Sequence, residues 1–176
     1  SEAEGYWDDV HGGWLDPKLV QAAREEEMSW LKKMQVYEKV PDTVRQAETG
    51  KQPITLKWVD TNKGTDDAPK YRSRLVAREI KKRGAVLPAP QLFSAMPPLE
   101  SIKALLSICV TKQRSKSGAP LKIGFWDISR AHFYGEARRR IFATLPEEDS
   151  EPGHCALLKR GWHGTQDASS IWQDDY

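Results

Sequence analysis

The sequence predicts an α+β fold in which helices and strands are partly segregated along the chain. Three patterns point to this class. A turn-rich loop joins two β-like runs between residues 54 and 80, helical apolar spacing follows Pro97-Pro98, and two short apolar runs lie between residues 141 and 159. The chain has 176 residues, which is enough for one ordinary domain or two small lobes.

Composition narrows the class of protein. Charged residues make up 30% of the chain and hydrophobic residues 39%, yet seven tryptophans argue against disorder. Cys109 and Cys155 are too few for a disulfide framework or a thiolate metal site. The sequence contains neither a signal peptide nor an apolar run of about 18 residues, so we expect a soluble, intracellular protein.

The N-terminal part combines an acidic leader with a helix. Residues 1–22 are the leader, and we expect it to be poorly ordered. Asp16-Pro17 predicts a helix start, because Asp is a good N-cap and Pro is tolerated in the first turn. Apolar spacing continues this helix to Met34, and a short strand is expected at residues 36–40.

A basic hairpin is the next expected feature, after a loop at residues 42–53. Residues 54–61 and 71–80 alternate as strands do, and the segment between them is rich in turn-forming residues. Residues 57–83 carry nine Lys or Arg against four acids. This local excess suits a polyanionic partner, although a merely solvated face is the more ordinary explanation of charge alone.

The second half predicts a helix followed by strands. Residues 83–98 hold four Pro and one Gly, which indicates an extended connector. Residues 121–128 predict a strand that enters a core, and residues 141–145 and 155–159 predict a hairpin across an acidic loop. A third helix is expected to start near residue 165. The helix that follows Pro97-Pro98 has an apolar stripe at helical spacing, which we expect to be buried; it is formed by Ile102, Leu105, Leu106, Cys109 and Val110.

Asp127 is the first candidate for chemistry. It follows an apolar run, and phosphoryl-transfer sites mount carboxylates on rigid strands because Mg²⁺ prefers oxygen ligands. An Asp that merely ends the strand and caps a turn is the simpler explanation. Strand alternation also places Asp127 on the face of Ile123 and Phe125, so the carboxylate needs a bulge or a strand end to reach solvent.

Residues 127–135 read Asp-Ile-Ser-Arg-Ala-His-Phe-Tyr-Gly and resemble the segment Asp-Val-Lys-Thr-Ala-Phe-Leu-Asn-Gly of copia-type retrotransposon reverse transcriptases. The match continues without a gap to Pro146. In that family this segment is motif A of the polymerase palm. The resemblance therefore implies that Asp127 is catalytic and binds two Mg²⁺ ions, helped by the backbone carbonyl of Ile128.

The resemblance covers most of the chain, from about Ala23 to Tyr176. It implies a right-hand polymerase fold with fingers at residues 23–98, a partial palm at residues 99–176 and no thumb. Further matching pieces follow the family's order at residues 23–31, 37–41, 57–59, 71–78, 93–94 and 101–102.

Arg72, Arg74 and Arg78 fall on one face of a regular strand. The fingers hairpin of this family closes over the incoming nucleotide, so the resemblance implies that these arginines bind its triphosphate. The planar guanidinium suits phosphate oxygens. The alternative is an exposed edge strand that uses charge against aggregation. Lys57 on the partner strand is a candidate for template contact.

Ala131 and His132 are candidate nucleotide-binding residues by the same resemblance. His132 stands where the family has Phe, an aromatic residue that lies under the sugar and excludes its 2′-hydroxyl. Residues 158–172 resemble the palm motif that supports template and nucleotide, which makes Gly164 and Gln166 candidate template contacts. Asp167 stands where the family has Gln.

The last residues contain a misleading match. Residues 172–175 read Trp-Gln-Asp-Asp and resemble the aromatic-x-Asp-Asp of motif C. They lie too close to Asp127 in the sequence, however, and the resemblance places them in the helix that precedes motif C in the family. Motif C is then expected beyond Tyr176, so we expect this chain alone not to polymerise.

The family implies several partners: an RNA or DNA template–primer, deoxynucleoside triphosphates and the rest of a Pol polyprotein, with no membrane. It implies a location in a cytoplasmic particle or the nucleus. Two other functions stay open, namely a non-catalytic nucleic-acid-binding remnant of a retroelement and a structural or protein-interaction domain.

Overall fold

The protein was studied as a computed structural model, which describes residues 5–79, 98–168 and 170–171. The described residues form two compact units, one made of residues 5–79, 131–168 and 170–171 and the other of residues 98–130. The mixture of helices and small sheets confirms the α+β class. No helix among the described residues is long and apolar enough to cross a membrane.

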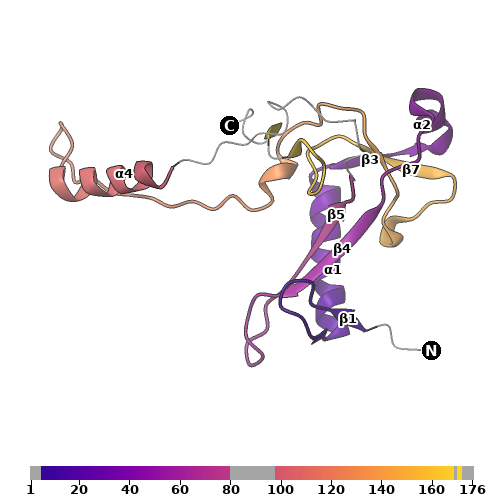
Figure 1. Ribbon diagram of the computed structural model, residues 1–176, viewed down its shortest axis with the longest axis horizontal. Coiled ribbons are helices and arrows are strands. Elements are labelled where there is room, and N and C mark those ends of the chain that lie inside the picture. The colour runs from indigo at the N-terminus through magenta and orange to yellow at the C-terminus, as the bar shows by residue number, and fades with distance from the viewer. Residues whose placement is uncertain (1–4, 80–97, 169, 172–176) are drawn as a thin grey trace. The chain divides into compact units, whose positions relative to one another are not determined.

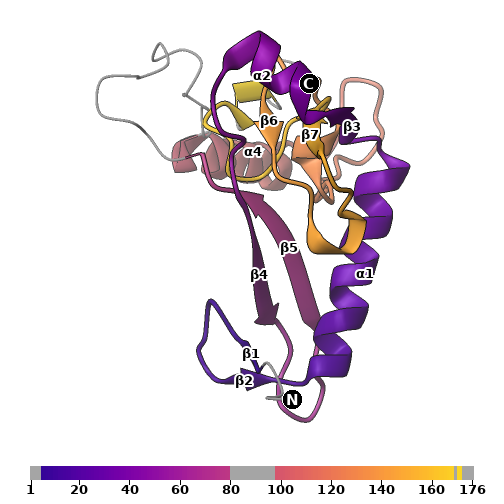
Figure 2. The ribbon, with the colours of Figure 1, turned by 90° about the vertical axis from the view of Figure 1, so that its right-hand side faces the viewer.

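The larger unit is organised by helix α1, Pro17–Lys33, and the hairpin of β4, Leu56–Asn62, and β5, Tyr71–Ala77. The side chain of Asp16 accepts hydrogen bonds from the backbone N–H groups of Lys18 and Leu19, as expected of an N-cap. Figure 2 shows α1 running alongside the hairpin. Helix and hairpin therefore form two layers.

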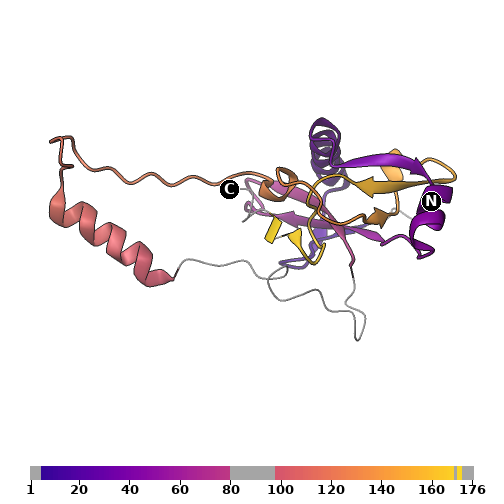
Figure 3. The same ribbon diagram turned by 90° about the horizontal axis from the view of Figure 1, so that it is seen from above.

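A second sheet completes this unit. Strand β3, Tyr37–Pro41, and strand β6, Phe142–Ala143, both pair antiparallel with β7, His154–Leu158, giving the order β3-β7-β6. Figure 3 shows β3 beside β7. The β6–β7 pairing confirms the expected hairpin, and its acidic connection contains the short 3₁₀ turn η2, Glu147–Asp149.

The core lies where these layers meet. Trp162 is fully buried, donates a hydrogen bond from Nε1 to the carbonyl oxygen of Leu75 at 2.7 Å, and stacks on Tyr37. Because an indole N–H needs a partner when buried, this bond fixes the segment that follows β7 against β5. The same cluster contains Met28, Leu31, Val36, Ala77, Phe133, Ile141, Ala143, Ala156 and Leu158.

The leader differs from its expectation. Residues 6–15 form a hairpin of β1, Tyr6–Trp7, and β2, Trp14–Leu15, rather than a poorly ordered stretch. It adjoins the β4–β5 hairpin, as Figure 1 shows. The physical reason is that Asp8 supplies the docking contacts described below, which composition alone does not reveal.

Residues 42–53 were expected to be a loop, but helix α2 spans Asp42–Thr49. Arg45 is buried, and its guanidinium binds both carboxylate oxygens of Asp42 one turn away, at 2.6 and 2.7 Å. Gly50 ends the helix in the left-handed conformation, with φ of 59°. These local contacts stabilise a helix too short to show clear periodicity.

The smaller unit contains helix α4, Leu99–Lys112, as expected after Pro98. Its apolar stripe was expected to be buried, but none of its described residues is. The expected strand at residues 121–128 is also wrong, since these residues have no regular secondary structure and pair with no described strand. No described element of this unit covers the stripe, and no described strand pairs with the backbone of residues 121–128.

Two expectations lie outside the described residues. They are the extended connector at residues 83–98, apart from Pro98, and the Trp-Gln-Asp-Asp segment at residues 172–175. The expected third helix is described only in part, where Ala168, Ser170 and Ile171 are helical.

Candidate nucleic-acid interface on the β4–β5 hairpin

The hairpin has two chemically different faces. Strands β4 and β5 pair with Thr61 opposite Arg72 and Val59 opposite Arg74, so these four side chains share one face. The other face packs against α1, as shown by the burial of Ser73, Leu75 and Ala77. We call the first the arginine face, formed by Lys57, Val59, Thr61, Arg72 and Arg74.

Arg24 of α1 fixes the orientation of the hairpin. Its guanidinium donates two hydrogen bonds to the buried Asp60 carboxylate, at 2.6 and 3.3 Å. It also lies over the rings of Tyr6 and Trp58, 4.7 and 4.9 Å from their centroids. The arginine face is thereby directed away from α1.

A cavity of about 390 Å³ opens on the arginine face. Among the described residues no acid lines it, so its lining is positively charged. Paired guanidinium groups suit phosphate oxygens, because each presents parallel N–H donors. Arg78 lies beyond β5 and is not part of this cavity. The lining residues are Val10, His11, Val59, Thr61, Lys63, Arg72 and Arg74.

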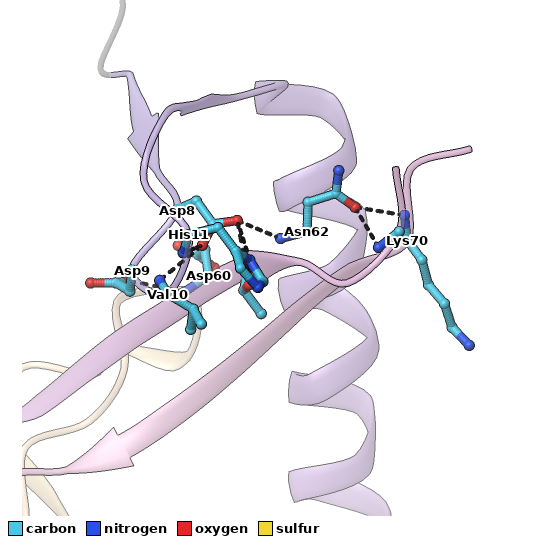
Figure 4. A network of polar contacts seen from close by, with 9 residues as sticks. Asp8, Asp9, Val10, His11, Asp60, Asn62 and Lys70 are labelled. Carbon is cyan, nitrogen blue, oxygen red and sulfur yellow. Dashed lines mark hydrogen bonds and ion pairs between the residues drawn. The ribbon is translucent and has the colours of Figure 1, made fainter. Parts of the chain in front are cut away.

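The N-terminal turn that supplies one wall of this cavity is held by Asp8. One carboxylate oxygen accepts the N–H groups of Val10 and His11, both at 2.8 Å, and the other accepts the N–H of Asn62 at 2.8 Å and the hydroxyl of Thr61. Figure 4 shows this network. The turn therefore docks against the outer edge of β4.

The ionisation of Asp8 follows from this environment. The carboxyl is only 3% exposed, and burial alone raises the pKa of Asp8. The N–H groups of His11, Asn62 and Val10 and the Thr61 hydroxyl outweigh burial and hold the pKa well below its usual range. Asp8 is thus charged in the folded protein at any pH near neutral.

We expect Asp8→Asn to destabilise the fold by about 1–2 kcal/mol near neutral pH, because an amide has one acceptor oxygen where the carboxylate has two. Since the folded pKa lies below the unfolded value of 3.8, the carboxylate's contribution is present above about pH 4 and is lost as pH falls through the folded pKa. Urea unfolding of both proteins at pH 7 and pH 3 measures this.

Asp9→Asn is the matched control, because Asp9 is adjacent but more exposed. We expect a smaller effect from it. A cost of Asp8→Asn that is equally large at both pH values contradicts the assignment of a depressed pKa.

Lys57, the candidate template contact, is engaged within the chain. Its Nζ lies 2.6 Å from a carboxylate oxygen of Asp9, while the other oxygen of Asp9 accepts the N–H of Asp60. A polyanion that uses Lys57 must therefore compete with Asp9 for the ammonium group.

Ala131 and His132 belong to the 3₁₀ turn η1, Ala131–Phe133. His132 Nδ1 lies 3.2 Å from the carbonyl oxygen of Ala168, and its ring meets that of His163 edge to face at 4.7 Å. His132 is thus packed against the segment that contains the candidate residues Gly164 and Gln166.

Gly164 lies where this segment crosses the end of β5. Its φ is 89°, and the N–H of Ala77 donates to the carbonyl oxygen of His163 at 2.7 Å. A Cβ at Gly164 would overlap the carbonyl oxygen of Ala77 and lie 2.7 Å from Val76 Cγ1. The position therefore needs glycine for packing as well as for conformation.

Arg139 joins the same region through two carboxylates. It binds Glu79 at 2.9 and 3.0 Å and Asp167 at 2.7 and 2.9 Å, and the N–H of Gln166 donates to Glu79 at 2.7 Å. Burial raises the pKa of Asp167, but the Arg139 guanidinium outweighs it and lowers that pKa. The negative charge of Asp167 is thus balanced by an internal partner.

Asp127 and Ile128 belong to the smaller unit, whereas the arginine face belongs to the larger one. Both residues are exposed. No group of three or more His, Cys, Asp or Glu side chains suited to a metal ion occurs among the described residues. Asp127 is therefore a solvent-exposed carboxylate that belongs to no such group among the described residues, and Ile128 follows it in the chain.

Comparison with known protein families shows to which family the chain belongs. The sequence model of the reverse transcriptase (RNA-dependent DNA polymerase) family matches residues 38–175, more than three quarters of the chain. The chain belongs to the reverse transcriptase family. No curated protein and no solved structure matches it. The hairpin, the arginine face and the Arg139 region all lie within this reverse transcriptase match, whereas β1 and β2 precede it.

Sequence reasoning missed several contributors to the interface, among them Asp8, His11 and Lys63. The signal for the first was present, because Asp8 begins a tight turn that ends in Gly12-Gly13 between two tryptophans. His11 and Lys63 gave no signal, since their place in the cavity depends on how that turn docks onto β4.

Proposed function

We propose that this chain forms the fingers, residues 23–98, and part of the palm, residues 99–176, of a copia-type RNA-directed DNA polymerase. The observation that supports this most is the arginine face. In a member of the reverse transcriptase family, Arg72 and Arg74 lie together on an antiparallel hairpin, in a cavity that no described acid lines. The triphosphate of an incoming nucleotide has the matching charge and oxygen geometry.

Within this proposal Asp127 is a metal ligand. Asp127 and the carbonyl of Ile128 would help to hold two Mg²⁺ ions, which would supply the Lewis-acid chemistry of two-metal nucleotidyl transfer. Magnesium sites often combine one or two carboxylates with waters and substrate phosphates, and an exposed Asp127 with the carbonyl of Ile128 fits such a partial donor set. The other carboxylates of such a site belong to motif C in this family, which the Trp-Gln-Asp-Asp segment at residues 172–175 is not expected to supply.

The same proposal assigns the partners. They are an RNA or DNA template–primer, deoxynucleoside triphosphates and the rest of a Pol polyprotein, in a cytoplasmic particle or the nucleus. Ala131 and His132 would contact the nucleotide, with the imidazole in the place of the family's Phe. Gly164 and Gln166 would support the template from the segment that packs on β5.

A manganese titration tests the metal assignment. We expect Mn²⁺ to broaden the NMR amide signals of residues 126–129 first, because a paramagnetic ion relaxes the nuclei nearest to its ligands. Asp127→Asn should abolish this broadening, while Asp66→Asn, which removes an exposed carboxylate in the hairpin loop, should leave it unchanged. Early broadening elsewhere, or broadening that survives Asp127→Asn, contradicts the assignment.

Primer extension with Mg²⁺ is the companion measurement. We expect no synthesis by this chain alone, because Asp127 would be only one of the three carboxylates that together hold the two metal ions in this family. Synthesis that depends on both Mg²⁺ and Asp127 would refute the inactivity. If the chain binds template–primer but Asp127 binds no metal, the alternative of a non-catalytic nucleic-acid-binding remnant is favoured.

A further inference from the structure

The β3-β7-β6 sheet has one face that points away from the main core. The strand register places Glu38, Leu157 and Phe142 side by side on this face. Helix α2 covers one end of it, where Val44 packs against the cluster that contains Phe142 and Leu157, and Figure 2 shows α2 next to β6 and β7. At the other end, beside Glu38 and Leu157, a cavity of about 620 Å³ opens to the surface.

This second cavity, which we call the basic cavity, has a strongly uneven charge. The cations in its lining are Arg138, Arg139, Arg140, Lys159 and Arg160. Among the described residues only two acids, Glu38 and Glu136, line it as well. The basic cavity therefore has three more positive than negative side chains and attracts anions.

A bulge next to β7 brings three of these cations together. The N–H of Ala137 donates to the carbonyl oxygen of Lys159 at 3.0 Å, and the N–H of Leu158 donates to the carbonyl oxygen of Ile141 at 2.9 Å. Two adjacent residues on the β7 side are thus bonded to two residues that lie four positions apart on the other strand. The arginines at positions 138–140 are the extra residues of this bulge.

The bulge directs its arginines to different surroundings. Arg139 is turned inward to the two carboxylates described above, and its side chain is 28% exposed. Arg138 is exposed, and the side chains of Arg140 and Lys159 are 59% and 53% exposed. Arg138, Arg140 and Lys159 are therefore the cations that a ligand from solvent can reach.

The anions that these exposed cations meet within the chain are carboxylates. Arg140 binds both oxygens of Glu48 at 2.5 and 2.6 Å, and Lys159 Nζ lies 3.5 Å from a carboxylate oxygen of Glu38. Exposed ion pairs of this kind contribute only about 0–1 kcal/mol, so a carboxylate from a partner can replace the internal one at little cost.

The acids in the lining favour a polypeptide over a nucleic acid. A nucleic acid carries a negative charge at every nucleotide, and a strand laid across the basic cavity would be repelled by Glu38 and Glu136. A polypeptide can place carboxylates beside Arg138, Arg140 and Lys159 and uncharged side chains beside the two acids. The cavity on the arginine face differs in this respect, because no described acid lines it.

We propose that the basic cavity is a docking site for an acidic segment of a protein partner. Carboxylates of that segment bind Arg138, Arg140 and Lys159, and Arg139 holds the bulge in place through its internal partners. The inference goes beyond the proposed function, because it uses neither Asp127 nor the arginine face.

Fluorescence anisotropy with the 176-residue chain and a short labelled peptide, in which Glu alternates with Ser, tests the docking site. We expect this peptide to bind and the same peptide with Gln in place of Glu not to bind. Arg140→Gln should weaken binding about two- to fivefold, and Arg138→Gln combined with Arg140→Gln about tenfold, because each exposed charge pair contributes up to about 1 kcal/mol.

Two acid variants test the same site in the opposite direction. Glu48→Gln removes the internal partner of Arg140 and should strengthen binding of the acidic peptide about twofold or more. Asp66→Asn makes the same change in net charge at an exposed position outside the cavity, and should leave the affinity unchanged. This pair separates a local effect from a general effect of protein charge.

Two cation variants complete the controls. Lys51→Gln removes an exposed cation outside the basic cavity, and Arg72→Gln removes one from the arginine face. Neither should change the affinity for the peptide. Urea unfolding of each variant shows whether it is folded, and we expect midpoints close to that of the parent for the exposed positions.

A Glu peptide that binds no more tightly than its Gln counterpart overturns the docking site, as does an Arg140→Gln variant that binds it as well as the parent. An unstructured oligonucleotide whose own affinity falls in Arg140→Gln as much as that of the peptide also overturns it, because the cavity is then a nucleic-acid surface. The manganese titration at Asp127 is independent of these outcomes, so the proposed function is decided separately.

Discussion

Gly164→Ala is expected to destabilise the larger unit by about 3–4 kcal/mol, the largest effect of any substitution considered. The left-handed backbone, with φ of 89°, costs a non-glycine residue about 1–2 kcal/mol, and overpacking adds about 1–3 kcal/mol. The added methyl group would overlap a carbonyl oxygen of β5 that cannot move without disturbing the N–H of Ala77 bound to His163. Urea unfolding followed by tryptophan fluorescence measures the loss.

Gly153→Ala is the control that separates the conformational cost of replacing a glycine from the packing cost. Gly153 has a similar φ of 75°, but nothing lies within 4 Å of the point where the added methyl group would sit, so only about 1 kcal/mol of conformational cost is expected. Equal costs for the two substitutions would show that the contact with β5 is not tight.

Arg139→Met is expected to destabilise the same unit by about 2–4 kcal/mol, because it leaves two carboxylates without their partner. Asp167 is only 4% exposed and Glu79 only 15%, so water cannot readily replace the guanidinium. Arg139→Lys should recover part of the loss, since an ammonium group keeps the charge but cannot bind both carboxylates through paired donors. Urea unfolding at pH 7 provides the comparison.

Arg140→Met is the matched control, because it removes the arginine next to Arg139 in the sequence. Arg140 also binds a carboxylate through two bonds, to Glu48, but its side chain is 59% exposed, and we expect little change. Adding Glu79→Gln and Asp167→Asn to Arg139→Met should restore stability, because the unpaired charges are then removed. A triple variant that is less stable than Arg139→Met would contradict this explanation.

Local patterns predicted the elements that depend on local chemistry. Asp16 caps α1 as expected, and the alternation of Arg72 and Arg74 placed them on one face of a hairpin whose strands end within a few residues of the expected positions. These features follow from capping and from the two-residue period of strands, which any short stretch of sequence reveals.

The predictions for residues 42–53 and for the leader were wrong because these segments depend on side-chain contacts that sequence periodicity does not reveal. Helix α2 depends on the Asp42–Arg45 pair and on Gly50, and the docked leader depends on Asp8 reaching Asn62. The expected strand at residues 121–128 failed in the opposite way, because strand-like alternation does not supply a pairing partner. Of the candidate site, Arg72 and Arg74 were predictable from spacing, whereas the contribution of His11 required the docked turn.

The turn at Asp8 has a further consequence for the edge of the sheet. A two-stranded hairpin normally leaves a free row of backbone donors and acceptors along each strand, and another chain can add to such a row. Here the N–H groups of Asp60 and Asn62 are bonded to Asp9 and Asp8, and the carbonyl of Asp60 accepts from Asp9. The leader thus occupies backbone groups to which a strand of a neighbouring polypeptide could otherwise bind, on the hairpin that also carries the arginine face.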